Sequence, residues 1–368
     1  MGSRPPYRAD HVGSLLRPAR LKEARARRAA GEITADELRE IEDAEIVKVI
    51  RRQEDIGLRA ATDGEFRRAF WQIDFLERLG GVESYEGERK VRFQGPQPKP
   101  VLLRTVGKVT APASHPMIEH FRFLRDNTRV AAKMTIPSPT SLHFRYGRAS
   151  IASDVYPDIE RFYDDLGKAY AELIRSFYEA GCRYLQLDEV NLAYLCDPAL
   201  REQVRERGED PERLPETYAG LIEAAIASRP SDMVVTMHLC RGNFRSTFVA
   251  SGGYGPVADI LFNRIGVDGY FMEYDTDRAG GFEPLRQVPG SKTIVLGLVT
   301  SKAGTLETKD ELKARIDEAS RFIDVGQLAL SPQCGFSSTE EGNVLGEDEQ
   351  WRKLDRIVEV AREVWGEV

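Results

Sequence analysis

Short apolar runs of strand character alternate with longer helical stretches along most of this sequence of 368 residues. Such alternation is typical of a parallel sheet whose strands are connected by helices that cover it. The eight runs of this kind are YRADHVGSLL, GLRAATDGE, RVAAKMTIPSP, CRYLQLDEV, DMVVTMHLC, DGYFMEYD, KTIVLGLV and QLALSPQCG. Eight is the number of strands in one closed barrel, so the pattern predicts an α/β chain folded as a single (β/α)8 TIM-type barrel.

One long segment interrupts this alternation and lies after the second expected strand. Residues from about 71 to 128 contain GG, YEGE, QGPQPKP and the alternating piece VLLRTVGKVTA, which predict a β-rich insertion. No low-complexity linker divides the chain, so we expect one domain over 1–368. Four aromatic residues of this part either line a substrate pocket or pack a small core of the insertion: Phe70, Trp71, Phe75 and Tyr85.

Composition and charge narrow the classes of partner. The formal net charge is -7, which does not favour binding to nucleic acid or to an anionic membrane. No apolar run approaches the roughly 20 residues that span a bilayer, and the first residues have no apolar signal core. Four cysteines are too few for a disulfide scaffold. We therefore expect a cytoplasmic protein with reduced thiols that acts on small molecules, with homo-oligomers allowed.

Four residues with side chains that bind soft metals follow the expected strands at their carboxyl ends. His238 and Cys240 end the run MVVTMHLC, Glu273 ends GYFME, and Cys334 ends LALSPQC. In a parallel barrel those ends converge on one face, and residues two apart in a strand point to the same side. Two thiolates, one imidazole and one carboxylate form a plausible tetrahedral zinc site.

The pattern alone leaves alternatives to this zinc site. The motif H-x-C is short and common by chance, and Asp275 and Asp277 lie on the same segment as Glu273. The other two cysteines, Cys182 and Cys196, are expected to be small buried apolar residues.

Six motifs in a fixed order carry a family resemblance. They are ADHVGSLLRP, TDGEFRR, YLQLDEVNL, VVTMHLCRGN, GYFMEYD and LSPQCGFSS. Together they resemble the catalytic domain of cobalamin-independent methionine synthases, and especially the short paralogues that lack the duplicated N-terminal half. The resemblance extends from about residue 8 to 340, and each motif is modest by itself, whereas their order is specific.

The resemblance implies a zinc site and an amino-acid site. The zinc ligands of the family match His238, Cys240, Glu273 and Cys334. Two acids match the residues that hold the α-ammonium group, Glu65 and Asp188, and a loop matches the residues that hold the α-carboxylate, Val12, Gly13 and Ser14. Asp188 and Glu273 are the candidate catalytic residues, with Glu273 as the zinc ligand that loosens when the substrate sulfur arrives.

Each acid also has a structural explanation. Glu65 could instead form an ion pair with Arg67 or Arg68. Asp188 could cap the end of its strand or pair with Arg183.

The function that the resemblance implies is zinc-dependent methyl transfer to a small thiol, with homocysteine giving methionine. The methyl donor stays open between methyl-tetrahydrofolate and a donor such as a methyl-corrinoid. The seventh run, LGLVTSK, lacks the His and Asp that serve the folate leaving group in the family, and TIPSPTSLHFRYG lacks its folate-stacking Trp. Turnover with folate is then expected to be slow unless another residue supplies the proton; the substitutes are His143, Phe144 and Tyr146 in that loop, and His11.

Two other functions remain in view. One is a zinc-dependent alkyltransferase or lyase acting on a different thiol, similar to epoxyalkane–coenzyme M transferase, with Arg17, Arg241 or Arg245 holding a sulfonate. The other is a binding protein with a structural zinc ion. A carboxylate ligand at the mouth of a barrel disfavours the second alternative, because structural sites are closed by Cys and His.

Overall fold

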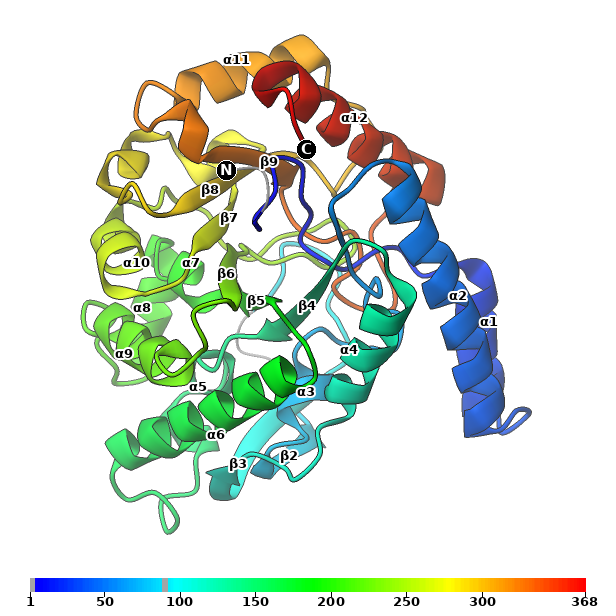
Figure 1. Cartoon of the computed structure of the whole chain (residues 1–368). Coiled ribbons are helices and arrows are strands. Elements are labelled where there is room, and N and C mark those ends of the chain that lie inside the picture. Colours follow the sequence, from blue (N-terminus) through cyan, green and yellow to red (C-terminus); the bar gives the residue numbers. More distant parts are fainter. Residues whose placement is uncertain (1–3, 88–91) are drawn as a thin grey trace.

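A curled parallel sheet forms the centre of the molecule, and helices surround it (Figure 1). The computed structural model describes residues 4–87 and 92–368. Seven strands are hydrogen-bonded in the order β1-β4-β5-β6-β7-β8-β9. Their bounds are Ala60–Ala61 for β1, Ala131–Pro137 for β4, Tyr184–Glu189 for β5, Val234–Leu239 for β6, Gly269–Glu273 for β7, Thr293–Val299 for β8 and Leu328–Pro332 for β9.

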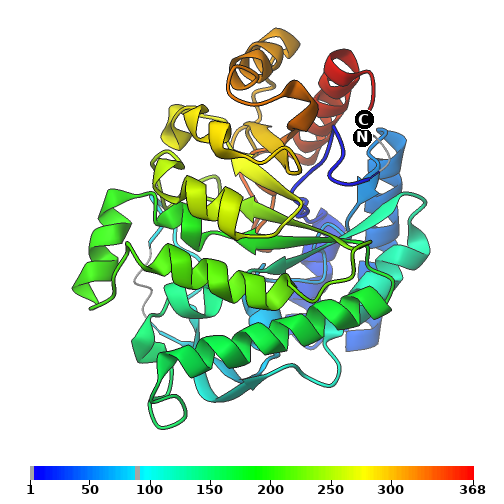
Figure 2. The same cartoon turned by 60° about the vertical axis from the view of Figure 1, so that its left-hand side comes forward.

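The helices mostly follow their strands along the chain and pack on the outside of the sheet (Figure 2). The longer helices are α1 Ala19–Ala29, α2 Ala35–Asp55, α4 Pro116–Asn127, α6 Ile159–Glu179, α8 Pro198–Glu206, α9 Leu214–Ile226, α10 Ala258–Arg264, α11 Lys309–Ala319 and α12 Glu347–Trp365. The four-residue helices are α3 Ile73–Leu76, α5 Ser141–Phe144 and α7 Asn191–Tyr194. No helix among the described residues is both long and apolar enough to cross a membrane.

Local sequence explains where these helices begin and which side they bury. Helix α2 starts with a capping box, in which the Thr34 side chain accepts from the Glu37 N–H and the Glu37 carboxylate accepts from the Thr34 N–H. Helix α6 buries Phe162, Leu166, Tyr170 and Phe177 at helical spacing. This buried side packs α6 against α9 and β3.

The prediction of an α/β fold with parallel strands is confirmed. Of the eight expected strands, the first in the chain is reduced to a single bridge. In the run YRADHVGSLL only Ala9 pairs, with Leu330 of β9. On the far side this segment meets the chain after β1 through single hydrogen bonds, from Thr62 Oγ1 to Gly13 O and from the Leu15 N–H to Gly64 O. Gly13 has a φ of 130°, so the backbone leaves the extended conformation before a ladder can form.

The expected insertion at about 71–128 is β-rich only in part, and its residues 88–91 lie outside the described ones. It contains an antiparallel pair, β2 Gly80–Glu86 and β3 Val101–Thr110, which lies beside α6 (Figure 1). The rest includes α3 and α4, and α4 packs against β4 as one of the outer helices. The prediction took α4 into the insertion because the turn-rich residues before it obscured its helical period.

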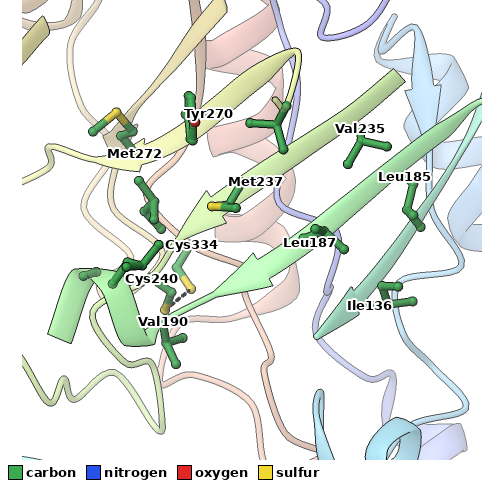
Figure 3. Packing of buried hydrophobic residues seen from close by; sticks show 14 of the residues in the cluster. Ile136, Leu185, Leu187, Val190, Val235, Met237, Cys240, Tyr270, Met272 and Cys334 are labelled. Carbon is green, nitrogen blue, oxygen red and sulfur yellow. Dashed lines mark hydrogen bonds between the residues drawn. The ribbon is translucent and has the colours of Figure 1, made fainter. Parts of the chain in front are cut away.

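Alternation along the strands separates an apolar face from a polar one. Figure 3 shows Leu185, Leu187, Val235 and Met237 in the apolar cluster of buried residues. Residues between them point to the opposite face, because successive side chains of a strand alternate. That face carries the polar residues Lys133, Thr135, Gln186, Asp188, Thr236 and His238, all buried.

A buried ion pair connects the N-terminal segment to this polar face. Lys133 Nζ lies 3.0 Å from Asp10 Oδ1, and both side chains are 0% exposed. Asp10 also accepts a hydrogen bond from the Tyr184 hydroxyl at 2.7 Å, and Lys133 donates to His11 O at 2.6 Å. The ammonium group lies 3.9 Å from the centroid of the Phe271 ring. These contacts hold residues 10–12 in place where regular strand pairing is missing.

Removing the acid of this pair should destabilise the protein strongly. Asp10→Asn leaves the Lys133 charge buried without its counterion, which should cost about 3–5 kcal/mol in the free energy of unfolding. Urea unfolding followed by circular dichroism measures this loss. The control is Glu212→Gln, which removes an exposed carboxylate that pairs with Arg201 and Arg205 and should cost less than about 1 kcal/mol. Equal costs for the two variants would contradict the role given to the buried pair.

Candidate functional site

Four side chains with metal-binding atoms meet at the carboxyl ends of the strands. His238 lies on β6, Cys240 follows that strand, Glu273 ends β7, and Cys334 follows β9. One ligand atom from each lies within 4.8 Å of those of the others, and all four residues are buried. The structure therefore brings together the four residues that the sequence singled out, which we call the ligand cluster. Asp275 and Asp277, the competing acids, are not members of it.

The geometry of the ligand cluster suits a tetrahedral cation. The two sulfur atoms lie 3.4 Å apart (Figure 3), close to the edge of about 3.8 Å in a tetrahedron with Zn–S bonds of about 2.3 Å. His238 Nδ1 lies 3.3 Å from Phe271 O, whereas its Nε2 is buried and has no hydrogen-bond partner among the described residues. With the proton on Nδ1 donated to the carbonyl, Nε2 presents its lone pair to the cluster, as in metal-bound histidines.

The two neighbouring thiols displace each other's pKa in opposite directions. A hydrogen bond from Cys240 holds the pKa of Cys334 well below its usual value, and His238 adds to this effect. The same hydrogen bond and burial raise the pKa of Cys240 well above its usual value. A divalent cation would stabilise both thiolates at once.

The carboxylate of Glu273 has protein partners that compete with a metal. Its Oε1 accepts from the Arg241 N–H at 2.7 Å, and its Oε2 lies 3.0 Å from Arg278 Nη2. Burial alone would raise the pKa of Glu273, but Lys302, Arg278 and Arg241 hold it below its usual value. Glu273 is therefore ionised and has a second set of partners available when it is not bound to a metal.

Three residues of the ligand cluster, all but Glu273, lie in the wall of a pocket that also contains most of the expected substrate residues. Val12, Ser14, Glu65 and Asp188 line it, beside His238, Cys240 and Cys334. Gly13 does not line it; a Cβ there would lie 2.6 Å from Thr135 Cγ2. Sequence reasoning missed further lining residues: Phe93, Arg145, Val190, Tyr194, Gly242, Asn243, Gly335 and Ser338. Several follow a strand closely, and that position was the signal that could have identified them.

The loop of Ser14 rests on the loop of Cys334. Ser14 O accepts from the Phe336 N–H at 2.9 Å. A Cβ on Gly335 would lie 1.9 Å from Ser14 Oγ, so a larger residue there would displace the Ser14 side chain. The close packing places the expected carboxylate-binding loop next to the ligand cluster.

Two buried acids that line the pocket, Glu65 and Asp188, have raised pKa values. Burial and the nearby Glu65 raise the pKa of Asp188 to about 7, and burial raises that of Glu65 as well. Glu65 Oε1 accepts from Thr135 Oγ1 at 2.9 Å and lies 3.5 Å from Arg68 Nη1, while Oε2 is buried without a partner among the described residues. A ligand with a positive charge would stabilise both acids in their ionised form.

One structural explanation of these acids is met, because Arg68 forms the expected ion pair with Glu65. Arg67 pairs with Glu42 and Asp43 instead, and Arg183 pairs with Asp232 instead of Asp188. Glu65 also has a φ of 61°, a backbone conformation that non-glycine residues rarely adopt. Strain of this kind is concentrated at functional sites.

The residues expected to serve a methyl donor or a sulfonate lie elsewhere. His143 contacts the Tyr218 hydroxyl with Nδ1 at 2.8 Å and Glu209 with Nε2 at 3.0 Å, so both of its ring nitrogens are engaged. Six more of the residues expected to serve the donor or a sulfonate also do not line the pocket: His11, Phe144, Tyr146, Arg17, Arg241 and Arg245. Arg17 is buried and donates to backbone carbonyls, whereas Arg145 is the arginine that lines the pocket.

Of the four aromatic residues considered for the pocket, Trp71 alone lines it. Phe75 packs on the His115 ring at a centroid distance of 4.4 Å, and the Arg104 guanidinium lies over the Tyr85 ring. Cys182 and Cys196 are buried outside the ligand cluster, as expected.

Comparison with known proteins identifies the family. The family model described as the catalytic domain of cobalamin-independent synthase matches residues 8–363. The chain belongs to this family. A relative from Bacillus subtilis, the uncharacterized protein YxjH, is 48% identical over 362 residues and covers 98% of this chain and 95% of its own length.

Two further relatives carry activity names. A solved structure from Listeria monocytogenes, described as a candidate vitamin-B12-independent methionine synthase, is 43% identical with a TM-score of 0.81 and covers 99% of both chains. A protein of Pyrococcus abyssi named methionine synthase is 24% identical and covers 88% of this chain and 85% of its own. The family and these neighbours support a methyltransferase of the methionine synthase type.

Replacing either thiol of the ligand cluster should abolish metal binding without unfolding the protein. Cys240→Ser and Cys334→Ser each remove a thiolate ligand, and zinc measured by atomic absorption should fall from one ion per chain to background. The fold should persist, because a core of this size does not depend on a metal. Cys182→Ser is the control, since Cys182 is a buried thiol outside the cluster and should leave zinc unchanged. Full zinc occupancy in both cluster variants would refute the ligand assignment.

Proposed function

We propose that this protein transfers a methyl group to the sulfur of homocysteine and so forms methionine, with a zinc ion held by His238, Cys240, Glu273 and Cys334. The observation that carries the proposal is the pocket itself, which joins the ligand cluster to Glu65, Asp188 and Ser14. A zinc ion bound there would lower the pKa of a coordinated substrate thiol and so supply the nucleophile.

The residues of the chain supply the rest of acceptor recognition. The carboxylates of Glu65 and Asp188 would hold the α-ammonium group, which offsets the unfavourable burial of both acids. The hydroxyl of Ser14 and the backbone of Val12, which both line the pocket, would hold the α-carboxylate. When the substrate sulfur arrives, Glu273 would give up the metal and keep its hydrogen bonds with Arg278 and the Arg241 N–H. Both partners already lie within hydrogen-bonding distance. We assign catalytic roles to Glu273 and Asp188 on this basis.

The methyl donor that we propose is methyl-tetrahydrofolate or another small methyl donor. A reducing compartment such as the cytoplasm suits the reaction, because Cys240 and Cys334 must stay reduced to bind a metal. The second candidate, alkylation of a sulfonate thiol, receives less support. Of the arginines expected to hold the sulfonate, none lines the pocket among the described residues, and two buried acids there would repel such an anion.

Removing the charge of Asp188 should weaken binding of the amino-acid acceptor far more than it changes zinc content. Asp188→Asn loses a charge-assisted contact with the α-ammonium group, worth about 1.5–3 kcal/mol, so KM for homocysteine should rise about 10- to 150-fold. Steady-state kinetics and zinc analysis measure the two effects. Mercaptoethanesulfonate, a thiol without an amino group, is the comparison substrate. If it proves the better substrate and is unaffected by the change, homocysteine is not the acceptor.

A further inference from the structure

Tyr194 has a fully buried hydroxyl without a hydrogen-bond partner in the wall of the pocket. The residue is 0% exposed and lines the pocket beside His238, Cys240 and Cys334. Its hydroxyl contacts no donor or acceptor among the described residues. A buried polar group left unpaired costs about 1–3 kcal/mol, so this arrangement indicates a group that a ligand satisfies.

The tyrosine is held in place by its surroundings. It ends α7, whose first N–H groups, those of Asn191 and Leu192, donate to Glu189 Oε1 at 2.6 and 2.9 Å. Its ring packs against Phe144 at a centroid distance of 5.9 Å, and the Arg145 guanidinium lies 6.0 Å from the ring centroid. Tyr194 is thus held in the pocket wall by a short helix that follows β5.

The hydroxyl is available as a proton donor. Burial raises the pKa of Tyr194, and the Arg145 guanidinium opposes this increase. The phenol is therefore protonated at neutral pH. The other lining groups are unsuited, since Glu65 and Asp188 face the ammonium group, the cysteines are metal ligands, and Arg145 does not give up a proton.

The seventh expected strand, which is β8, supplies no proton donor of its own. The run LGLVTSK contains neither the His nor the Asp that serve a folate leaving group, and β8 accordingly ends in Val299. His143, the substitute that the sequence suggested, has both ring nitrogens engaged by Tyr218 and Glu209. A reaction whose leaving atom is an amine nitrogen needs a proton from some other group in the pocket.

We propose that Tyr194 donates this proton to the leaving nitrogen of a methyl-tetrahydrofolate-type donor. This role rests on the proposed function. The acceptor sulfur forms a bond to the methyl carbon as the bond between carbon and nitrogen breaks, and the electron pair stays on nitrogen. The nitrogen takes the proton of the Tyr194 hydroxyl, and the resulting phenolate regains a proton from water.

The test compares two methyl donors, of which only one needs a proton at the leaving atom. Methyl-tetrahydrofolate needs one, whereas methyl iodide releases iodide and does not. Tyr194→Phe should lower kcat with the folate donor about 10²–10⁴-fold. The same variant should alkylate bound homocysteine with methyl iodide at a rate within about twofold of the parent. The solvent deuterium isotope effect of the parent folate reaction should change in the variant, since proton transfer is no longer through Tyr194.

Controls separate a proton donor from a structural residue. Tyr218→Phe removes an equally buried hydroxyl that faces His143 and does not line the pocket, so the ratio of the two rates should not change. Zinc content and homocysteine binding, measured by calorimetry, should be equal in Tyr194→Phe and the parent. A loss of similar size with both donors, or no loss with the folate donor, would overturn the proposal.

Failure of the proposed function gives a different result. If the parent binds zinc and homocysteine and reacts with methyl iodide but not with the folate donor, the role of Tyr194 is wrong while the acceptor assignment stands. If the parent neither binds homocysteine nor alkylates it, the proposed function and the role of Tyr194 are both wrong.

Discussion

The buried contact between Lys133 and Asp10 is the interaction on which the arrangement of the site depends. The N-terminal segment has one bridge to β9 and only single hydrogen bonds toward β1, so the ladder that fixes other strands is missing there. An ion pair at 0% exposure supplies the directional restraint instead. Because Val12 and Ser14 follow directly, the position of the expected carboxylate-binding loop is set by an interaction located below the pocket.

Parallel register accounts for the rest of the site. Asp188 of β5 pairs in register with His238 of β6, which pairs with Phe271 of β7. Side chains of one level therefore point into the same space, so Asp188 lies beside His238 of the ligand cluster. Glu273 ends β7 two residues further along, at the level of Gly297. The proposed amino-acid site and the proposed metal site thus depend on the same strand alignment.

The sequence predicted most of the parallel strands. It did not predict that the N-terminal segment would form a single bridge in place of a strand. The parallel strands could be predicted from their apolar runs, and the ligand cluster from the places of its residues at strand ends. The bridge at Ala9 could not, because strand character does not reveal whether a partner ladder exists. Tyr194 and Arg145 were missed because the sequence pattern does not give the direction of their side chains. His143 was misjudged for the same reason, as its partner Tyr218 is distant in sequence.

The positive φ of Glu65 has a consequence for how acceptor specificity can evolve. A residue there must tolerate the left-handed conformation, which glycine, asparagine and aspartate do best. Asp188 lies on a regular strand, where most side chains are accommodated by the backbone. Substitutions that exchange one thiol substrate for another therefore meet a backbone restriction at position 65 that is absent at position 188. Divergence within such a pocket would begin on the strand and leave the turn unchanged.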